Sequence, residues 1–293
     1  IETLNLGTNR LSGQIPWQIG AMQNLRELRL NNNQLTGGLP REFGSIGNRL
    51  LTAQQTSKNA ASLTQAQTLQ ILDVSNNQLE GRIPAEWANM VNMREFAVSN
   101  NNLSGDIPRG IAAWRSLVSL RLANNGFFGE LPSGVQWENL VEVRLENNRF
   151  TGAVPLEIAQ ASRLRILSVH NNRFTYLPNL LRTRVDTVTA ENNAIEFGSL
   201  EPLLRVSPAI RLLRVAPQQR IGAERDTVLE RGASLVLPSE IGGEQTVYQW
   251  FKDSSIVRGT AGRQSVFRVD SAIRVNSGVY FCRATNPLFP NLT

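Results

Sequence analysis

A motif built on leucine and asparagine recurs through the first two thirds of this 293-residue chain and limits its fold more than any other feature. Segments such as LRLNNNQLTGGLP, LDVSNNQLEGRIP and VRLENNRFTGAVP share one template, and a weaker copy contains Asn193. A period of about two dozen residues indicates stacked units, each of which buries its apolar face against the next. From the first copy to Asn193 the shared asparagines lie 24, 44, 24, 24, 23, 24 and 21 residues apart. Before Asn193 they are Asn9, Asn33, Asn77, Asn101, Asn125, Asn148 and Asn172.

Each unit predicts one short strand. Its L-x-L core alternates apolar and polar residues, so Leu28 and Leu30 are expected to point inward and Arg29 outward. Stacked units then form a parallel sheet. Because a buried amide needs hydrogen bonds, we expect the shared asparagines to form a ladder that bonds to the backbone of adjacent coils. Further along each unit, a glycine such as Gly37 permits a tight backbone and a proline such as Pro40 stiffens the return segment.

The pattern L-x-x-L-x-L-x-x-N-x-L-x-G-x-I-P resembles the plant-type leucine-rich repeat over residues 1–205. The resemblance implies a right-handed curved solenoid, with a concave parallel sheet and irregular or 3₁₀ segments on the convex side. It also implies binding of proteins, peptides or glycans rather than catalysis. Trp17, Trp114 and Trp137 follow the proline turn and are expected to pack the convex side rather than bind sugar.

The single spacing of 44 residues adds a segment at about 49–68, rich in Gln, Thr, Ser and Ala. We interpret it as an inserted surface loop, which can shape a binding face. The alternative is a degenerate repeat with Leu51 and Asn59 in template positions. Gln54 and Thr56 would then occupy apolar strand sites, which argues against this alternative.

The asparagine period stops after residue 205, and the composition of the chain changes. Residues 206–216 are expected to form a cap and a linker. Residues 217–293 contain short alternating segments separated by turn residues, which predicts an antiparallel β-sandwich. The segment ending at Cys282 resembles an immunoglobulin-like domain, with Trp250 as the core tryptophan and Tyr280 as the tyrosine corner. The family's second cysteine falls at Ser239, so the inter-sheet disulfide is absent and Cys282 is expected to be a buried structural thiol. Strand G is expected to be incomplete, which indicates a fragment of a longer protein.

The outward positions of the repeat strands are the candidate binding surface. Arg121 and Arg144 are expected in one column of the concave face, with Arg29 further along it. Arginine can form bidentate contacts with carboxylates or stack on rings and sugars. The alternative is ion pairing within the face, with Glu27, Glu95 and Glu142. The predicted binding residues are Arg26, Arg29, Asp73, Arg94, Arg121, Arg144, Arg165 and His170.

Several classes of site and partner are excluded from the prediction. One cysteine and one histidine, Cys282 and His170, provide neither a multi-cysteine metal site nor a histidine-assisted triad, so no metal, cofactor or catalytic residue is predicted. The net charge of +6 is spread along the chain, which argues against a nucleic-acid partner. No apolar run is long enough to span a membrane. The sequences Asn102-Leu103-Ser104 and Asn291-Leu292-Thr293 match the acceptor pattern for N-glycosylation.

These features predict a non-enzymatic binding or adhesion module, extracellular or at the cell surface, that recognises a protein or glycan through the concave face. The combination of repeats with a disulfide-free immunoglobulin-like domain resembles bacterial cell-surface proteins. Three alternatives stay open: the ectodomain of a receptor-like or inhibitor protein, an accessory binding region of a larger secreted enzyme, and a purely structural role in a surface layer.

Overall fold

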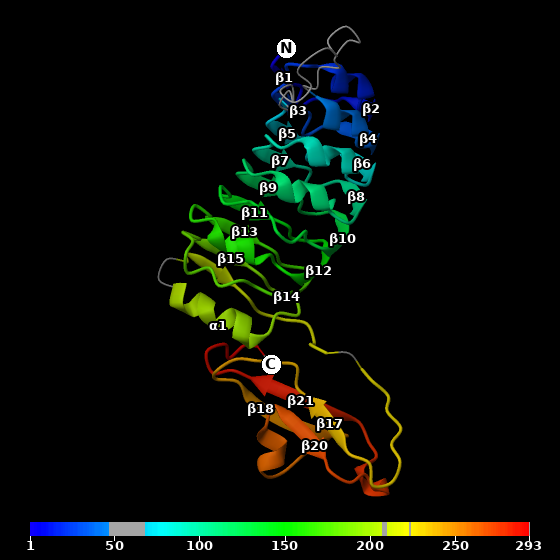
Figure 1. The fold of residues 1–293 in the computed structure, drawn as a ribbon, viewed down its shortest axis with the longest axis vertical. Coiled ribbons are helices and arrows are strands. Elements are labelled where there is room, and N and C mark those ends of the chain that lie inside the picture. Colours follow the sequence, from blue (N-terminus) through cyan, green and yellow to red (C-terminus); the bar gives the residue numbers. More distant parts are fainter. Residues whose placement is uncertain (47–67, 207–209, 223, 293) are drawn as a thin grey trace, which may run out of the picture.

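The computed structural model describes residues 1–46, 68–206, 210–222 and 224–292. Figure 1 shows a stack of coils that runs from the N-terminus to helix α1 (Phe197–Val206), followed by a smaller unit of antiparallel strands. The predicted loop at 49–68 lies outside the described residues except for Thr68. Strands from either side of it pair directly with each other, Leu28 opposite Leu72.

The L-x-L segments form one parallel sheet of nine strands, called the long sheet here. Within each strand the central apolar side chain points into the solenoid, and Leu28, Phe96 and Leu167 are fully buried there. The polar residues on either side of it point outward. The strands are, in spatial order, β1 (Thr3–Asn5), β3 (Glu27–Arg29), β5 (Ile71–Asp73), β7 (Glu95–Ala97), β9 (Ser119–Arg121), β11 (Glu142–Arg144), β13 (Ile166–Ser168), β15 (Thr187–Thr189) and β16 (Leu212–Arg214).

The return segments form a second parallel sheet of seven strands, which the sequence reasoning did not predict. The repeated glycines lie in this sheet with φ between 70° and 92°, a region that other residues rarely adopt. The strands are β2 (Ser12–Gln14), β4 (Gln34–Gly38), β6 (Gln78–Gly81), β8 (Asn102–Gly105), β10 (Gly126–Glu130), β12 (Arg149–Ala153) and β14 (Arg173–Tyr176).

Short 3₁₀ helices follow the repeated prolines, as the resemblance predicted. Trp114 and Trp137 are fully buried, and their indole N–H groups donate to backbone carbonyls of the preceding coil at 3.3 Å. Trp17 is 60% exposed, so the prediction that it packs the convex side is wrong. The helices are η1 (Trp17–Ala21), η2 (Arg41–Ser45), η3 (Ala85–Asn89), η4 (Arg109–Ala113) and η5 (Leu156–Gln160).

The asparagine ladder is present as predicted. Asn101 Nδ2 donates to the carbonyls of Val74 and Val98, at 3.1 and 3.0 Å, and its Oδ1 accepts the Leu79 N–H at 3.0 Å. The amide therefore ties its own coil to the one before it. The same arrangement recurs from Asn33 to Asn193.

A second row of asparagines precedes the ladder residues and is exposed. Its members have φ between 54° and 58°, the left-handed conformation that asparagine tolerates better than most residues. From Asn76 onward each side-chain amide donates to the one in the previous coil, as from Asn124 to Asn100 at 2.6 Å, and Asn32 donates to the Thr8 hydroxyl. The row consists of Asn32, Asn76, Asn100, Asn124, Asn147, Asn171 and Asn192.

The solenoid continues past the point where the asparagine period ends. The segment at 206–216, for which the sequence predicts a cap and linker, contributes β16 as the ninth strand. Gln218 then takes the ladder position. Its Nε2 donates to the carbonyls of Ala190 and Val215, at 2.9 and 2.6 Å, and its Oε1 accepts the Ile195 N–H at 3.0 Å.

The C-terminal unit consists of two small antiparallel sheets around a core of Trp250 and Phe267, whose ring centroids are 5.7 Å apart. The Tyr280 hydroxyl donates to the Asn276 carbonyl at 2.8 Å. From the first strand, Leu235 and Leu237 pack on this core. The strands are β17 (Leu235–Pro238), β18 (Val247–Lys252), β19 (Ser255–Ile256), β20 (Val266–Val269) and β21 (Tyr280–Thr285), with 3₁₀ helices η6 (Thr260–Arg263) and η7 (Arg274–Asn276).

The C-terminal unit is joined to the last coil through α1. Phe197 of α1 stacks on Phe289, with ring centroids 6.2 Å apart, and Phe289 belongs to the same buried core as the repeat leucines. The Glu201 carboxylate accepts the backbone N–H groups of Glu244 and Gln245, at 2.9 and 3.2 Å. The two units therefore share both apolar packing and hydrogen bonds.

Candidate binding surface

The solvent-facing side chains of the long sheet, called the long-sheet face here, contain most of the predicted binding residues. The register places Arg121 directly opposite Arg144, and Arg29 opposite Asp73 in the same column. Parallel strands hold such neighbours about 4.8 Å apart. The side chains of one column are thus close enough to interact across strands.

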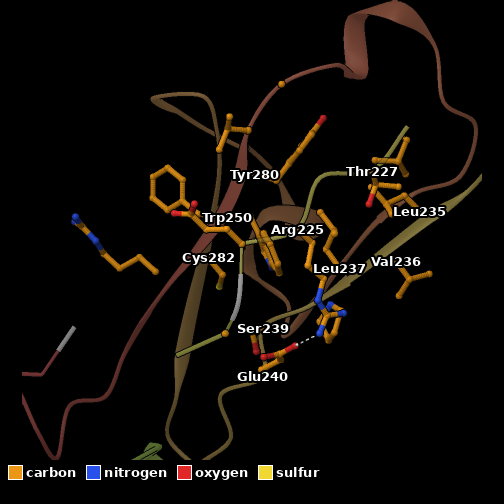
Figure 2. Close-up of a pocket in the computed structure, with 18 of the residues that line it drawn as sticks. Arg225, Thr227, Leu235, Val236, Leu237, Ser239, Glu240, Trp250, Tyr280 and Cys282 are labelled. Carbon is orange, nitrogen blue, oxygen red and sulfur yellow. Dashed lines mark hydrogen bonds and ion pairs between the residues drawn. The ribbon is translucent and has the colours of Figure 1, made fainter. Parts of the chain in front are cut away.

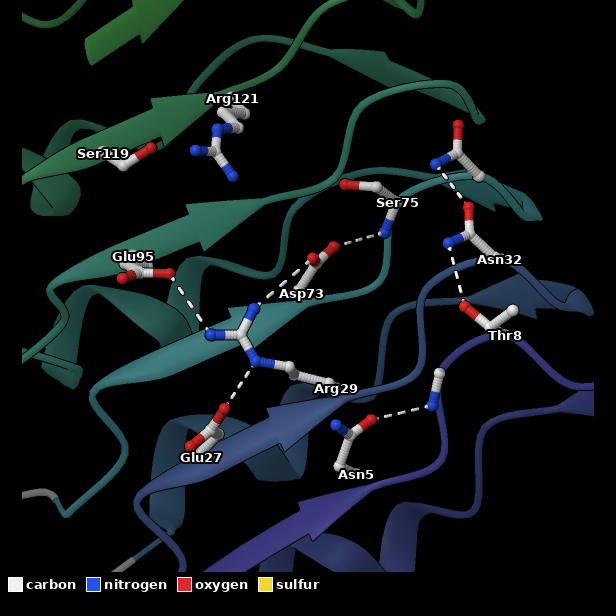
Figure 3. A network of polar contacts seen from close by, with 12 residues as sticks. Asn5, Thr8, Glu27, Arg29, Asn32, Asp73, Ser75, Glu95, Ser119 and Arg121 are labelled. Atoms are coloured by element: carbon white, nitrogen blue, oxygen red, sulfur yellow. Dashed lines mark hydrogen bonds and ion pairs between the residues drawn. The ribbon is translucent and has the colours of Figure 1, made fainter.

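One charged network surrounds Arg29 (Figure 3). Its Nε donates to Glu27 Oε1 at 2.5 Å, and its Nη1 and Nη2 lie 3.7 and 3.4 Å from carboxylate oxygens of Asp73 and Glu95. Asp73 is held in turn by the Ser75 N–H, at 3.0 Å from Oδ1. Three carboxylates around one guanidinium give this end of the face an excess of negative charge.

A second network has Glu142 at its centre. Arg121 Nε lies 2.7 Å from Glu142 Oε2 and Arg144 Nε lies 2.5 Å from Oε1, and the glutamate is only 13% exposed. Burial acts to raise the pKa of Glu142, but the hydrogen bonds from Arg144 and Arg121 lower it below its usual value. Ion pairing within the face, the alternative weighed from the sequence, is therefore what the structure shows for Arg29, Arg121 and Arg144.

Next to this network, Glu146, His170 and Glu191 follow the ends of the adjacent strands β11, β13 and β15, each two residues beyond its strand. His170 Nδ1 lies 2.9 Å from Thr189 Oγ1. Glu146 is 12% exposed, and burial raises its pKa. Its Oε2, like Oε2 of Glu191, is buried without a hydrogen-bond partner among the described residues. Neither glutamate is among the predicted binding residues. For Glu146 the sequence did contain a signal. Charged and apolar residues alternate in Glu142-Val143-Arg144-Leu145-Glu146, which indicates that Glu146 points outward with Glu142 and Arg144.

Small residues separate the two networks. Ala97, Ser99, Ser119 and Ala123 lie on β7 and β9 or directly after them, and all are at least nine-tenths buried. Their short side chains leave a low strip between two groups of long charged side chains. The two networks of long charged side chains are thus separated by positions whose side chains are short and almost fully buried.

The other predicted residues lie at the margin of the face. Arg26 faces Glu2 at 3.8 Å, and both side chains are more than half exposed. Arg165 lies 3.7 Å from Asp186. Arg94 is exposed and forms no ion pair with a described residue. Exposed pairs of this kind contribute little to stability.

A separate cavity of about 1720 Å³ involves the C-terminal unit (Figure 2). Its lining includes Leu237, Trp250 and Cys282 of that unit, and Phe197 and Gln218 from the end of the solenoid. Burial raises the pKa of Cys282, which disfavours the reactive thiolate form. The residue is only partly buried, whereas the sequence predicted a buried thiol.

Two further findings concern the whole of the described chain. In the described ranges, no group of three or more His, Cys, Asp or Glu side chains is placed to hold a metal ion. Among the helices of the same ranges, none has both the length and the apolar character required to cross a bilayer.

The comparison with protein families identifies leucine-rich repeats in the chain. The family model described as Leucine Rich Repeat matches residues 24–46 and 68–90. These ranges contain β3 to β6, and they include Asn33 and Asn77 of the ladder. A comparison with curated proteins gives no match.

Solved structures similar to this chain include several receptors. A TDR receptor structure is 26% identical with a TM-score of 0.63, covering 75% of this chain and 35% of the receptor chain. The plant peptide hormone receptor RGFR1 in complex with RGF2 is 26% identical with a TM-score of 0.57, covering 67% and 29%. The Arabidopsis receptor kinase HAESA, in complex with the peptide hormone IDA and the co-receptor SERK1, is 29% identical with a TM-score of 0.52, covering 67% and 34%. This chain therefore spans about a third of the length of those receptor chains.

Proposed function

We propose that this chain is a non-enzymatic, extracellular binding module that recognises a protein partner through the long-sheet face. One observation carries the proposal: charged side chains on adjacent strands are fixed by ion pairs around Arg29 and around Glu142, with a strip of small residues between them. A surface whose side chains are ordered before binding loses little conformational entropy when a partner docks. The similar receptors named above supply independent support, because two of them are solved with peptide hormones.

The C-terminal unit fits this proposal as an immunoglobulin-like spacer. Its two antiparallel sheets, the Trp250 core and the Tyr280 hydroxyl bonded to the Asn276 backbone support that assignment. The chain has no second cysteine, which favours a bacterial surface protein that mediates adhesion. The receptor ectodomain is the second candidate, favoured by the similarity to plant receptors.

The test is binding of the full chain to arrays of cell-surface proteins and of glycans. The variant Arg121→Glu/Arg144→Glu reverses two charges on the long-sheet face and should abolish binding to the protein recognised by the wild type. Arg115→Glu/Arg163→Glu makes the same charge change at two exposed positions outside that face and should leave binding intact.

A second variant separates binding from stability. Arg94→Trp places a bulky ring at an exposed position of the same face that forms no ion pair with a described residue, so it should block the partner while the melting temperature stays near that of the wild type. Full binding by both long-sheet variants would contradict the proposed surface.

A further inference from the structure

The outward side of the second sheet has a set of polar and aromatic side chains that the proposed function does not use. Along β10, β12 and β14 the buried phenylalanines Phe127, Phe150 and Phe174 stack on one another inside the solenoid, with centroids about 6 Å apart. Their neighbours in sequence therefore point outward. We call this set the outer shelf, and it consists of Asn102, Ser104, Phe128, Arg149, Thr151 and Arg173.

The strand register brings these residues together. Phe128 is the Cα partner of Arg149, and Thr151 is the Cα partner of Arg173. Ser104 is the Cα partner of Gly126 on the next strand. Because glycine has no side chain, no side chain at that position lies between Ser104 and Phe128. Residues from four consecutive strands, β8 to β14, thus contribute to one continuous surface, labelled along one side of the solenoid in Figure 1.

The two arginines of the shelf have no counter-charge. Arg149 and Arg173 are exposed, and neither forms an ion pair or side-chain hydrogen bond with a described residue. Glu130 is the acidic residue nearest in the register, opposite Thr151, but its carboxyl group lies against the backbone of Gly152. Both guanidinium groups are therefore free to receive an anion.

Beside Arg149 the surface is hollowed. A depression of about 390 Å³ is lined by Asn102, Ser104, Asn124 and Arg149 among others. The side chains of Asn102 and Ser104 form no hydrogen bond with described residues, so an amide and a hydroxyl are available to a ligand in the depression. These groups can both donate and accept hydrogen bonds, as sugar hydroxyls do.

An aromatic ring completes the set. Phe128 is 45% exposed although its neighbour Phe127 is fully buried. An exposed ring presents a flat apolar face on which the C–H face of a pyranose can pack. Guanidinium groups bind carboxylates in a bidentate manner. Ring, free guanidinium groups, amide and hydroxyl together match the chemistry of an acidic sugar.

We propose that the outer shelf binds oligosaccharides that carry carboxylate groups, that is, chains of uronic acids. The carboxylates pair with Arg149 and Arg173, the ring hydroxyls bond to Asn102 and Ser104, and one sugar packs on Phe128. An acidic peptide would need the two arginines but not the hydroxyl-lined depression. The site belongs to a different sheet from the long-sheet face, so it is independent of the proposed protein partner.

The experiment is isothermal titration calorimetry of the full chain, produced in a bacterial host so that Asn102 carries no glycan. The probes are tetrasaccharides of alginate and of galacturonate, with cellotetraose as the neutral counterpart. We expect heat of binding with at least one acidic tetrasaccharide and none with cellotetraose. Arg149→Gln/Arg173→Gln should weaken that binding about tenfold or more, because two charge-assisted contacts are lost.

The controls separate the shelf from general attraction to a basic protein. Arg115→Gln/Arg163→Gln removes the same charge elsewhere and should change the affinity less than about twofold. Phe128→Ser should weaken binding while the melting temperature is retained, and inorganic polyphosphate should not displace the sugar at equal charge concentration. The proposal is overturned if neither acidic tetrasaccharide binds, if cellotetraose binds equally well, if the Arg149/Arg173 variant binds like the wild type, or if polyphosphate competes fully.

Discussion

At the scale of single residues, neighbouring asparagines have opposite roles. Asn101 is 8% exposed and bonds to four backbone groups in two coils, whereas Asn102 is exposed on the outer shelf. Asn101→Ala leaves buried carbonyls and an N–H without partners, so we expect a loss of about 3 kcal/mol in the free energy of unfolding. Asn102→Ala should stay within about 0.5 kcal/mol of the wild type. Urea unfolding of both variants measures the difference, and equal losses would show that the ladder is not what stabilises this coil.

Glu146 makes stability depend on pH in a direction opposite to most carboxylates. Because burial raises its folded pKa above the unfolded value, the folded chain binds the proton more tightly. The stabilising effect of protonated Glu146 is therefore complete below the unfolded pKa and is lost as pH rises through the raised folded pKa. We expect Glu146→Gln to gain stability relative to the wild type between pH 4 and pH 7, measured by urea unfolding at several pH values. Glu224→Gln, at an exposed position, controls for the charge change. If the stability of Glu146→Gln relative to the wild type falls as the pH rises, the assignment is contradicted.

The ladder asparagines could be predicted from the sequence because each lies in an apolar context at a fixed spacing. The exposed row that precedes them, such as Asn100 and Asn124, could not be assigned in the same way. Its members occur in the same Asn-Asn pairs, but their role depends on a backbone with positive φ, which the repeat pattern does not reveal by itself. The glutamates at the centre of the long-sheet face were under-predicted for a related reason: Glu142 is held by side chains from two strands, its own and the one before it.

At the scale of the elements, β10 offers a direct comparison of its two faces. Phe127 is fully buried and stacks on Phe150, while Phe128 is 45% exposed. Phe127→Ala should cost about 3–5 kcal/mol, because it removes a buried ring and leaves a cavity. Phe128→Ala should cost less than about 1 kcal/mol. Thermal and urea unfolding check both values, and a large loss for Phe128→Ala would mean that the outer shelf is packed in the folded protein.

The long sheet could be predicted from the repeat, and the resemblance to leucine-rich repeats implied the 3₁₀ helices, whereas neither predicted the second sheet or the ninth strand. The strands of the second sheet contain few apolar residues, and all of them except β14 contain glycine, so their pairing depends on the stacking of coils rather than on strand propensity. The ninth strand escaped the prediction because Gln218 replaces asparagine. Its side chain is one methylene longer, yet it bonds to backbone groups equivalent to those of Asn193, one coil further along. A search for any carboxamide at the ladder position would have found it.

At the scale of the whole molecule, the last coil is covered by the C-terminal unit rather than by solvent. Ala284, Phe289 and Leu292 belong to the same buried core as the repeat leucines. Repeat proteins transmit stability mainly between neighbouring units, so the C-terminal unit acts on the solenoid as one more neighbour. We expect the full chain to unfold in one main calorimetric transition because of this shared core.

Glu201 of α1 provides the test of that coupling. Burial acts to raise its pKa, but the N–H groups of Glu244 and Gln245 and the Asn286 amide lower it further than burial raises it. Its contribution to stability is therefore present above the unfolded pKa and is lost as pH falls through the lowered folded pKa.

The double variant Glu201→Gln/Phe289→Ala removes this carboxylate and also the stack of Phe289 on Phe197. We expect it to separate the melting of the C-terminal unit from that of the solenoid at pH 7. Differential scanning calorimetry should then show two transitions, while Glu244→Gln, whose ion pair with Arg205 is exposed, should keep one. Two well-separated transitions in the wild type at pH 7 would show instead that the junction does not couple the units.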